Sequence, residues 1–230
     1  GSSTVTATLS LPRNLQGHAL FRAFDEFFAE NAEPPEQVHV DFSRVVFIKP
    51  PSVAFLSNLS HWLVNIGIEV KYVGMNLNVA AIRYLDDSGF FELHTGSRIW
   101  PDGECRPTTM PLKQLAKSNS HFWLDTSFIP WLSEKSGLSP VSLAEVKTCL
   151  QELVNNISDH TAYDEGCVFG QWYPNINEIV VSVADFGVGI PKNVARIADG
   201  LDDSEAIKKA AEDGFSSKSL PTNRGAGLYL

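Results

Sequence analysis

The sequence has no long hydrophobic run and little positive charge, and each absence excludes a class of protein. None of its windows approaches 18 consecutive apolar residues, so no membrane-spanning helix is predicted. The 18 Lys and Arg residues are outnumbered by 27 Asp and Glu residues, which gives a formal net charge of −9. Because nucleic-acid affinity comes largely from Lys and Arg that neutralise phosphates, we do not expect broad nucleic-acid binding as the main task.

Cysteine is scarce too. Cys105, Cys149 and Cys167 are odd in number, widely spaced and without a CxxC pair, so neither a disulfide framework nor a zinc site is indicated. Reduced, partly buried thiols are expected instead. The first residues, Gly1-Ser2-Ser3, lack the basic and apolar regions of a signal peptide, and we therefore expect a cytoplasmic protein.

Apolar sequence is present in the amount typical of a folded domain, since 43% of the residues are hydrophobic and 20% are charged. In residues 4–97, strand-like runs alternate with helix-like runs. Strands are predicted at Val38–Phe42, Val45–Ile48 and Val70–Val73, and an amphipathic helix is predicted over Val53–Ile66. This βαβ rhythm predicts an α/β fold in which helices pack on a small sheet.

The rest of the chain divides into a connector and a second domain. Residues 98–140 are interrupted by prolines, and we predict a connector with helical segments such as Phe128–Ser136. The prolines are Pro101, Pro107, Pro111, Pro130 and Pro140. Over residues 141–230 the periodicity predicts a helix, two strands and a glycine-containing loop.

The helix of the second domain is predicted to begin at Ser142 and to end near Asp159. Ser142 is the predicted N-cap, and Glu145, three residues on, completes a capping box. The apolar residues of this helix fall on one stripe at 3.6-residue spacing, which is the face that packs on a sheet. They are Leu143, Val146, Leu150, Leu153, Val154 and Ile157.

Three polar residues project together from roughly the opposite face of this helix: Glu152, Asn156 and Asp159. Mg²⁺ prefers oxygen ligands and keeps several waters, so one Asn oxygen with phosphate oxygens can hold it. Glu152 would then orient or deprotonate an attacking water or a substrate hydroxyl. The alternative is an ordinary solvated face, because polar faces are common on amphipathic helices.

Two glycine motifs follow this helix. The β-branched run Glu178–Ala184 predicts a strand that ends at Asp185-Phe186-Gly187-Val188-Gly189, where glycines let the backbone turn sharply and approach a ligand. Asp185 can accept a hydrogen bond from the exocyclic amine of adenine. Further on, Arg224-Gly225-Ala226-Gly227-Leu228 forms a loop that leads into an apolar, helix-ready end and offers amide N–H groups to phosphate. Alone, each motif is also explained by a plain turn.

In this order and spacing, the segments resemble the GHKL (histidine kinase-like, Bergerat-fold) ATPase superfamily. Residues 152–159 look like its N-box, residues 185–189 like its G1 box and residues 224–228 like its G2 box. The run Phe215-Ser216-Ser217-Lys218 is similar to the F-box region of histidine kinases. The resemblance implies that ATP and Mg²⁺ bind to a GHKL α/β sandwich with helices on one face of a mixed sheet.

By that resemblance, Glu152 is the general base, Asn156 coordinates Mg²⁺ and Asp185 contacts adenine. The other ATP-binding residues implied are Asp159, Gly187, Gly189, Lys218, Arg224, Gly225 and Gly227. Family members usually continue past the G2 box with the rest of a helix and closing strands, whereas this chain stops at Leu230. We therefore expect a domain that is truncated or completed by another segment.

The first domain is similar to STAS domains of the anti-sigma-antagonist type. The stretches that carry this resemblance are Val40–Ile48, Gly67–Gly74 and Leu85–Phe90. Where such domains carry an Asp-Ser phosphoacceptor pair, this sequence has Lys49-Pro50-Pro51-Ser52. Proline has no hydroxyl to phosphorylate, so a conventional phosphosite is not expected, and Asp41 is predicted to be a strand-end turn residue.

Three functions stay open on the sequence. The leading one is an ATP-hydrolysing or ATP-gated regulatory switch that changes how the two domains meet each other or a protein partner, because a pure binder would not need Glu152. The alternatives are an anti-sigma-type serine/threonine kinase acting on another protein and a non-catalytic ATP-binding scaffold. An autophosphorylating histidine kinase is disfavoured, since no histidine is directly followed by Asp or Glu. We also expect that the chain can form a homodimer, and we expect no membrane partner.

Overall fold

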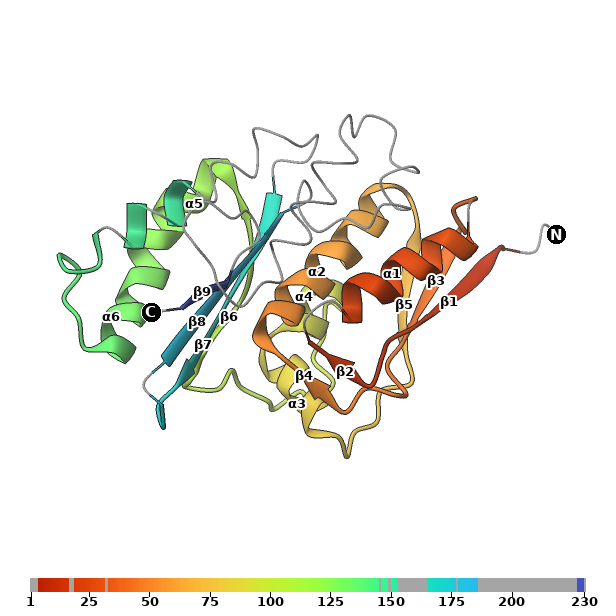
Figure 1. The fold of residues 1–230 in the computed structure, drawn as a ribbon, viewed down its shortest axis with the longest axis horizontal. Coiled ribbons are helices and arrows are strands. Elements are labelled where there is room, and N and C mark those ends of the chain that lie inside the picture. The colour runs from red at the N-terminus through yellow and green to blue at the C-terminus, as the bar shows by residue number, and fades with distance from the viewer. Residues whose placement is uncertain are drawn as a thin grey trace.

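The computed structural model describes residues 4–16, 19–31, 33–144, 146–148, 150–152, 165–176, 178–185 and 227–229. Over this part of the chain, parallel and antiparallel strands combine with helices (Figure 1), which confirms the mixed α/β class. None of the helices found there is long and apolar enough to cross a membrane.

The first sheet is parallel, with strand order β1-β3-β5. Its strands are β1 (Thr6–Ser10), β3 (Gln37–Asp41) and β5 (Glu69–Val73), and a separate short parallel pair is formed by β2 (Asn14–Leu15) and β4 (Phe47–Ile48). Parallel neighbours need a crossover connection, which the helices α1 (Ala19–Glu30) and α2 (Pro50–Asn65) provide. The predicted βαβ rhythm is confirmed.

The second sheet has the order β6-β7-β8-β9, and every described pairing in it is antiparallel, whereas the resemblance implied a mixed sheet. The strands are β6 (Thr109–Ala116), β7 (Glu165–Tyr173), β8 (Glu178–Asp185) and β9 (Gly227–Tyr229). Strand β6 comes from the stretch predicted as a connector. It tolerates Pro111 because it is an edge strand whose register shifts between Met110 and Lys113.

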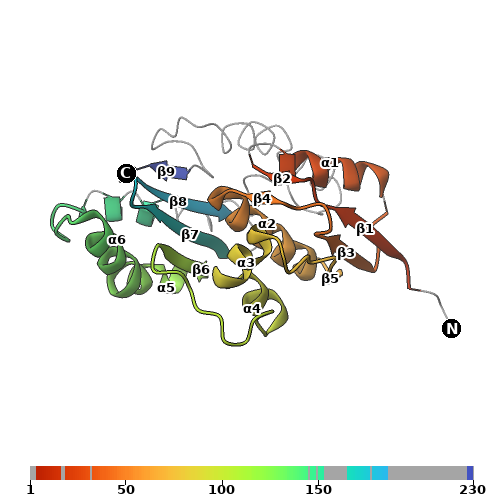
Figure 2. The ribbon, with the colours of Figure 1, turned by 90° about the horizontal axis from the view of Figure 1, so that it is seen from below.

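Helices cover both faces of the second sheet. On one face lie α5 (Lys117–Trp123), the π-helical turn η1 (Leu124–Phe128) and α6 (Ile129–Ser136), as Figures 1 and 2 show. The predicted helix Phe128–Ser136 is thereby confirmed. The opposite face carries α2, so the expectation of helices on one face only is wrong for the whole chain.

Helix α2 lies between the two sheets and is buried around most of its circumference. Leu56 and Leu63 are fully buried, and so are the small polar residues Ser57 and Ser60. The prediction of an amphipathic helix is therefore wrong: serines that would mark a solvent-facing side contact protein instead. The helix starts after Lys49 with two prolines, which are favourable in a first turn because their missing N–H groups have no helical partner there.

Buried and turn-forming carboxylates fix the connections of the first sheet. Asp41 accepts a hydrogen bond from the Ser43 backbone N–H at 2.9 Å, which confirms Asp41 as a turn residue. Asp86 lies in α3 (Ala80–Asp87), which precedes α4 (Phe90–Thr95), and is fully buried. Its two oxygens accept from the backbone N–H groups of Ile99 and Trp100 at 2.8 and 3.0 Å. These bonds hold the start of the predicted connector against the first sheet and the helices α1 to α4, which together we call the first unit.

Candidate functional site

The strand that precedes the first glycine motif has the predicted type and position. Strand β8 runs from Glu178 to Asp185, and Asp185 pairs with Gly166 of β7. Val181 and Val183 belong to the apolar cluster beneath α5 and α6. Asp185 is thus the last residue of a central strand, and packing fixes the position of the residues just before it.

The second glycine motif reaches the same strand. Gly227 is the first residue of β9, and it pairs with Ser182 of β8 in an antiparallel ladder. The prediction of a helix-ready end is wrong at this point, because Leu228 and Tyr229 continue as a strand along the free edge of β8. Ser182 and Asp185 are three residues apart, about 10 Å at 3.3 Å per strand residue.

Glu152 belongs to a segment that packs on the second sheet. We call it the Glu152 segment; its described residues 144, 146–148 and 150–152 are helical. Leu143 and Leu150 are each 1% exposed and join Val146 in the apolar cluster that contains Val183, which confirms the predicted packing face for these three residues. The other predicted members, Leu153, Val154 and Ile157, lie outside the described residues. The Glu152 side chain is exposed, as predicted for the opposite face.

The start of this segment differs from the prediction. The hydroxyl of Ser139 accepts from the Ser142 backbone N–H at 3.2 Å, and the Ser139 carbonyl accepts from the Leu143 N–H at 3.1 Å. Ser139 therefore makes the capping contact predicted for Ser142. The predicted partner Glu145 lies outside the described residues.

Most of the predicted ATP-binding residues fall outside the part of the chain that the structure describes. They are Asn156, Asp159, Gly187, Gly189, Lys218, Arg224 and Gly225. Of the predicted site, the structure places Asp185 and Gly227 on neighbouring strands of one sheet, with Gly227 opposite Ser182, three residues before Asp185.

No protein-family model, curated protein or solved structure matches this chain.

A polar cluster that the sequence did not predict lies beside the end of β8. Glu165 begins β7, next to Gly166, and its Oε2 atom accepts from Gln114 Nε2 at 2.6 Å and lies 3.0 Å from His61 Nε2. These three residues come from β7, β6 and α2. No sequence pattern could have found them, because His61 and Glu165 are 104 positions apart.

A second polar chain crosses from the first unit into the second sheet. The Cys167 thiol donates to the Ser57 hydroxyl at 3.4 Å, and Ser57 Oγ lies 2.7 Å from His94 Nε2. This direction of donation, from thiol to hydroxyl to imidazole, suits a neutral histidine, whose unprotonated nitrogen accepts from the hydroxyl. Burial raises the pKa of the Cys167 thiol to about 12 and lowers the pKa of His94 to about 4, with the charge of His61 a smaller cause for His94.

The neutral state of His94 predicts a pH-dependent stability. Its folded pKa of about 4 lies below the ordinary value of 6.5, so between these limits the unfolded chain binds a proton that the folded chain does not. The free energy of unfolding should therefore fall as the pH decreases from about 6.5 to about 4, by roughly 1 kcal/mol per pH unit. Urea denaturation at pH 4.5, 5.5 and 6.5 measures this slope.

The control for this prediction is a matched pair of substitutions. His94→Gln should reduce the pH dependence of the free energy of unfolding by roughly 1 kcal/mol per pH unit. His39→Gln, at a histidine that contacts Gln37 on the first sheet, should leave this pH dependence unchanged. Equal slopes in the wild type and in His94→Gln would contradict the assignment.

Proposed function

We propose that the chain binds Mg-ATP at the end of the second sheet where Asp185 and Gly227 lie, and hydrolyses it as a regulatory switch. One observation carries the proposal: β8, which ends at Asp185, is hydrogen-bonded to β9, which begins with Gly227. These residues are 42 positions apart (227 − 185). A single pocket shared by the two glycine motifs needs this proximity.

Each residue has a separate role in the proposed pocket. Asp185 accepts a hydrogen bond from the adenine amine, and backbone N–H groups of the glycine motifs bind the phosphates. Asn156 holds Mg²⁺, which when bound neutralises phosphate charge. Glu152 orients or deprotonates the attacking water. Support for that role comes from the Glu152 segment, whose apolar residues share a cluster with Val183.

The switch is proposed to act through α2. This helix packs against β7 and β8 on one side and against β5 on the other, so a shift of β8 on nucleotide binding would be felt in the first unit. The bonds from Glu165 to His61 and Gln114 join the same elements near the end of β8. A protein partner, or a second copy of the chain, would then detect the altered first unit.

The experiment that tests this proposal is calorimetric titration of the full chain with adenylyl imidodiphosphate, a non-hydrolysable ATP analogue, and Mg²⁺. We expect one site per chain. Asp185→Asn should weaken binding about 10- to 100-fold, because a hydrogen bond to a charged group contributes roughly 1.5–3 kcal/mol.

The control is Glu178→Gln, a carboxylate at the opposite end of β8, which should leave the affinity unchanged. Absence of binding by the folded chain, or equal affinities for the wild type and Asp185→Asn, would refute a pocket at Asp185. Transfer of labelled phosphate from ATP to a second protein, without free phosphate release, would identify a kinase in place of an ATPase.

A further inference from the structure

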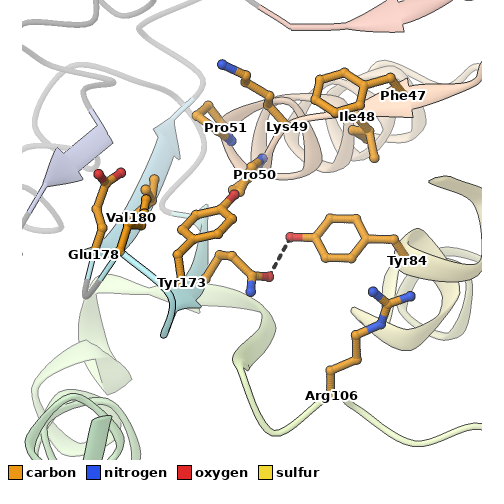
Figure 3. A pocket seen from close by; sticks show the side chains of 12 residues that line it. Phe47, Ile48, Lys49, Pro50, Pro51, Tyr84, Arg106, Tyr173, Glu178 and Val180 are labelled. Atoms are coloured by element: carbon orange, nitrogen blue, oxygen red, sulfur yellow. Dashed lines mark hydrogen bonds between the residues drawn. The ribbon is translucent and has the colours of Figure 1, made fainter. Parts of the chain in front are cut away.

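A pocket of about 530 Å³ opens between the start of α2 and the strands β7 and β8 of the second sheet (Figure 3). Its walls come from the junction of β4 and α2, from α3, and from β7 and β8. The apolar and aromatic part of the lining includes Phe47, Pro50, Pro51, Tyr84, Tyr173 and Val180. Ligand pockets in proteins have volumes of roughly 300–1,000 Å³ and mostly apolar walls.

The polar groups inside the pocket are held in fixed positions. The Tyr84 hydroxyl donates to Gln171 Oε1 at 2.8 Å (Figure 3), and Thr109 donates to the same oxygen at 3.1 Å. The Gln171 amide nitrogen donates to the carbonyls of Thr108 and Trp172 at 3.3 and 2.9 Å. Gln171 is fully bonded, so a ligand need not reorganise these side chains.

Positive charge predominates at the rim. Arg106 Nε donates to Asp87 Oδ2 at 3.0 Å, and its guanidinium lies 5.3 Å from the centre of the Tyr84 ring. Asp87 is shared with Arg83, whose Nε donates to Oδ1 at 3.0 Å. One carboxylate between two guanidinium groups leaves a net positive charge.

Lys49 adds a second cation to the lining, and its side chain is exposed. Within the described ranges, no carboxylate lies within ion-pair distance of the Lys49 ammonium. Among the described residues that line the pocket, Glu178 is the one carboxylate, so the two cations Lys49 and Arg106 outnumber it. An anion is therefore favoured over a cation in this pocket.

The pocket and the proposed nucleotide site lie at opposite ends of β8. Glu178 and Val180 line the pocket, whereas Asp185 ends the strand. The seven residue steps from Glu178 to Asp185 span about 23 Å of extended strand. A molecule in the pocket would therefore not overlap with a nucleotide bound at Asp185.

We propose that this pocket is a second ligand site, which takes a planar aromatic acid whose ring lies against Tyr84, Tyr173 and the two prolines and whose anionic group contacts Arg106, while the Lys49 ammonium on another wall adds long-range attraction. The ring requirement follows from the apolar and aromatic walls. The charge requirement follows from the cation excess at the rim. This site does not depend on the proposed ATPase function.

The test uses 8-anilinonaphthalene-1-sulfonate, an aromatic anion with a planar naphthalene ring, and follows its fluorescence as the full chain is titrated. We expect one saturable site per chain. Arg106→Gln should weaken binding about 3- to 10-fold, the range for a charge contact at a partly exposed position, and Lys49→Gln, which removes only long-range attraction, less than about threefold. Binding of N-phenyl-1-naphthylamine, which has the same rings without the sulfonate, should be unchanged in both variants.

The matched control is Arg83→Gln. Arg83 makes the same bond to Asp87 as Arg106 does, but it stacks on Trp100 at 4.7 Å and does not line the pocket. Its substitution should change sulfonate affinity less than about twofold. Saturating adenylyl imidodiphosphate with Mg²⁺ should not displace the probe.

Three results would overturn the proposal: no single saturable site, equal weakening by Arg83→Gln and Arg106→Gln, or displacement of the probe by the ATP analogue. If Arg106→Gln fails to fold, the salt dependence of the wild type decides: raising NaCl from about 20 to about 500 mM should weaken sulfonate binding and leave N-phenyl-1-naphthylamine binding unchanged. Equal salt responses of the two probes would then refute the anion site.

Discussion

Glu152→Gln should lower the rate of ATP hydrolysis by a factor of about 10² to 10⁴, the usual contribution of a positioned general base. Glutamine keeps the size and hydrogen-bonding shape of the side chain but cannot take a proton from water. Glu152 is exposed on a segment packed against the second sheet, so the substitution removes no buried contact. Release of inorganic phosphate measures turnover, and calorimetry with the ATP analogue measures binding.

Binding should stay within about twofold of the wild type, since an interaction that acts only in the reaction step changes turnover without affinity. Glu104→Gln, at another exposed glutamate, is the matched control and should leave both quantities unchanged. Full turnover by Glu152→Gln would remove the general-base assignment. Binding by a wild-type chain with no turnover would support the ATP-binding scaffold instead.

Phe169→Ala should destabilise both units of the protein together. Phe169 belongs to β7 of the second sheet, yet it is fully buried in the apolar cluster of the first unit and makes an edge-to-face contact with Tyr84 at 6.1 Å between ring centres. Removing a buried phenyl ring costs about 3–5 kcal/mol. For a chain of this size the melting temperature should fall by roughly 10 °C.

Scanning calorimetry measures this effect and also counts the transitions. Because Leu112, Phe169 and Ala184 of the second sheet share one cluster with α2, we expect a single transition that shifts as a whole. Phe122→Ala is the matched control: Phe122 is 72% exposed, and its loss should cost less than about 0.5 kcal/mol. Two transitions, of which only one moves, would contradict a shared core.

Elements whose signal is local were predictable from the sequence. Strand β8 is a β-branched run, and the first sheet has the expected alternation of strands and helices. Leu143 and Leu150 both pack in the apolar cluster of the second sheet because their seven-residue spacing matches two helical turns and puts them on one face.

Elements that depend on a distant partner were not predictable. Strand β6 contains Pro111, which argues against a strand until its edge position and bulge are known. Leu228 and Tyr229 pair with β8, although the preceding glycines favour the start of a helix. The burial of Ser57 and Ser60 needs the second sheet against α2, which the sequence of the first unit does not reveal.

The residues of the candidate site also divide into those with a local sequence signal and those that meet only through tertiary packing. Glu152 stands out because it lies on the polar face of a segment with helical period, and Asp185 because it ends a β-branched strand. The cluster of Glu165, His61 and Gln114 has no such signal, since its members lie on three separate elements and meet only through tertiary packing. The pocket lined by Lys49 and Arg106 could not be predicted from the sequence for the same reason, because its walls come from separate elements.

The proline of β6 also restricts how the protein can associate. Pro111 has no amide hydrogen, and the shifted register around it bends the outer edge of the strand, so a foreign strand finds an interrupted row of hydrogen-bonding groups there. Within the described part of the sheet, the edge left for such an addition is the outer side of β9. Addition of a foreign strand at the β6 edge of the second sheet is thereby disfavoured.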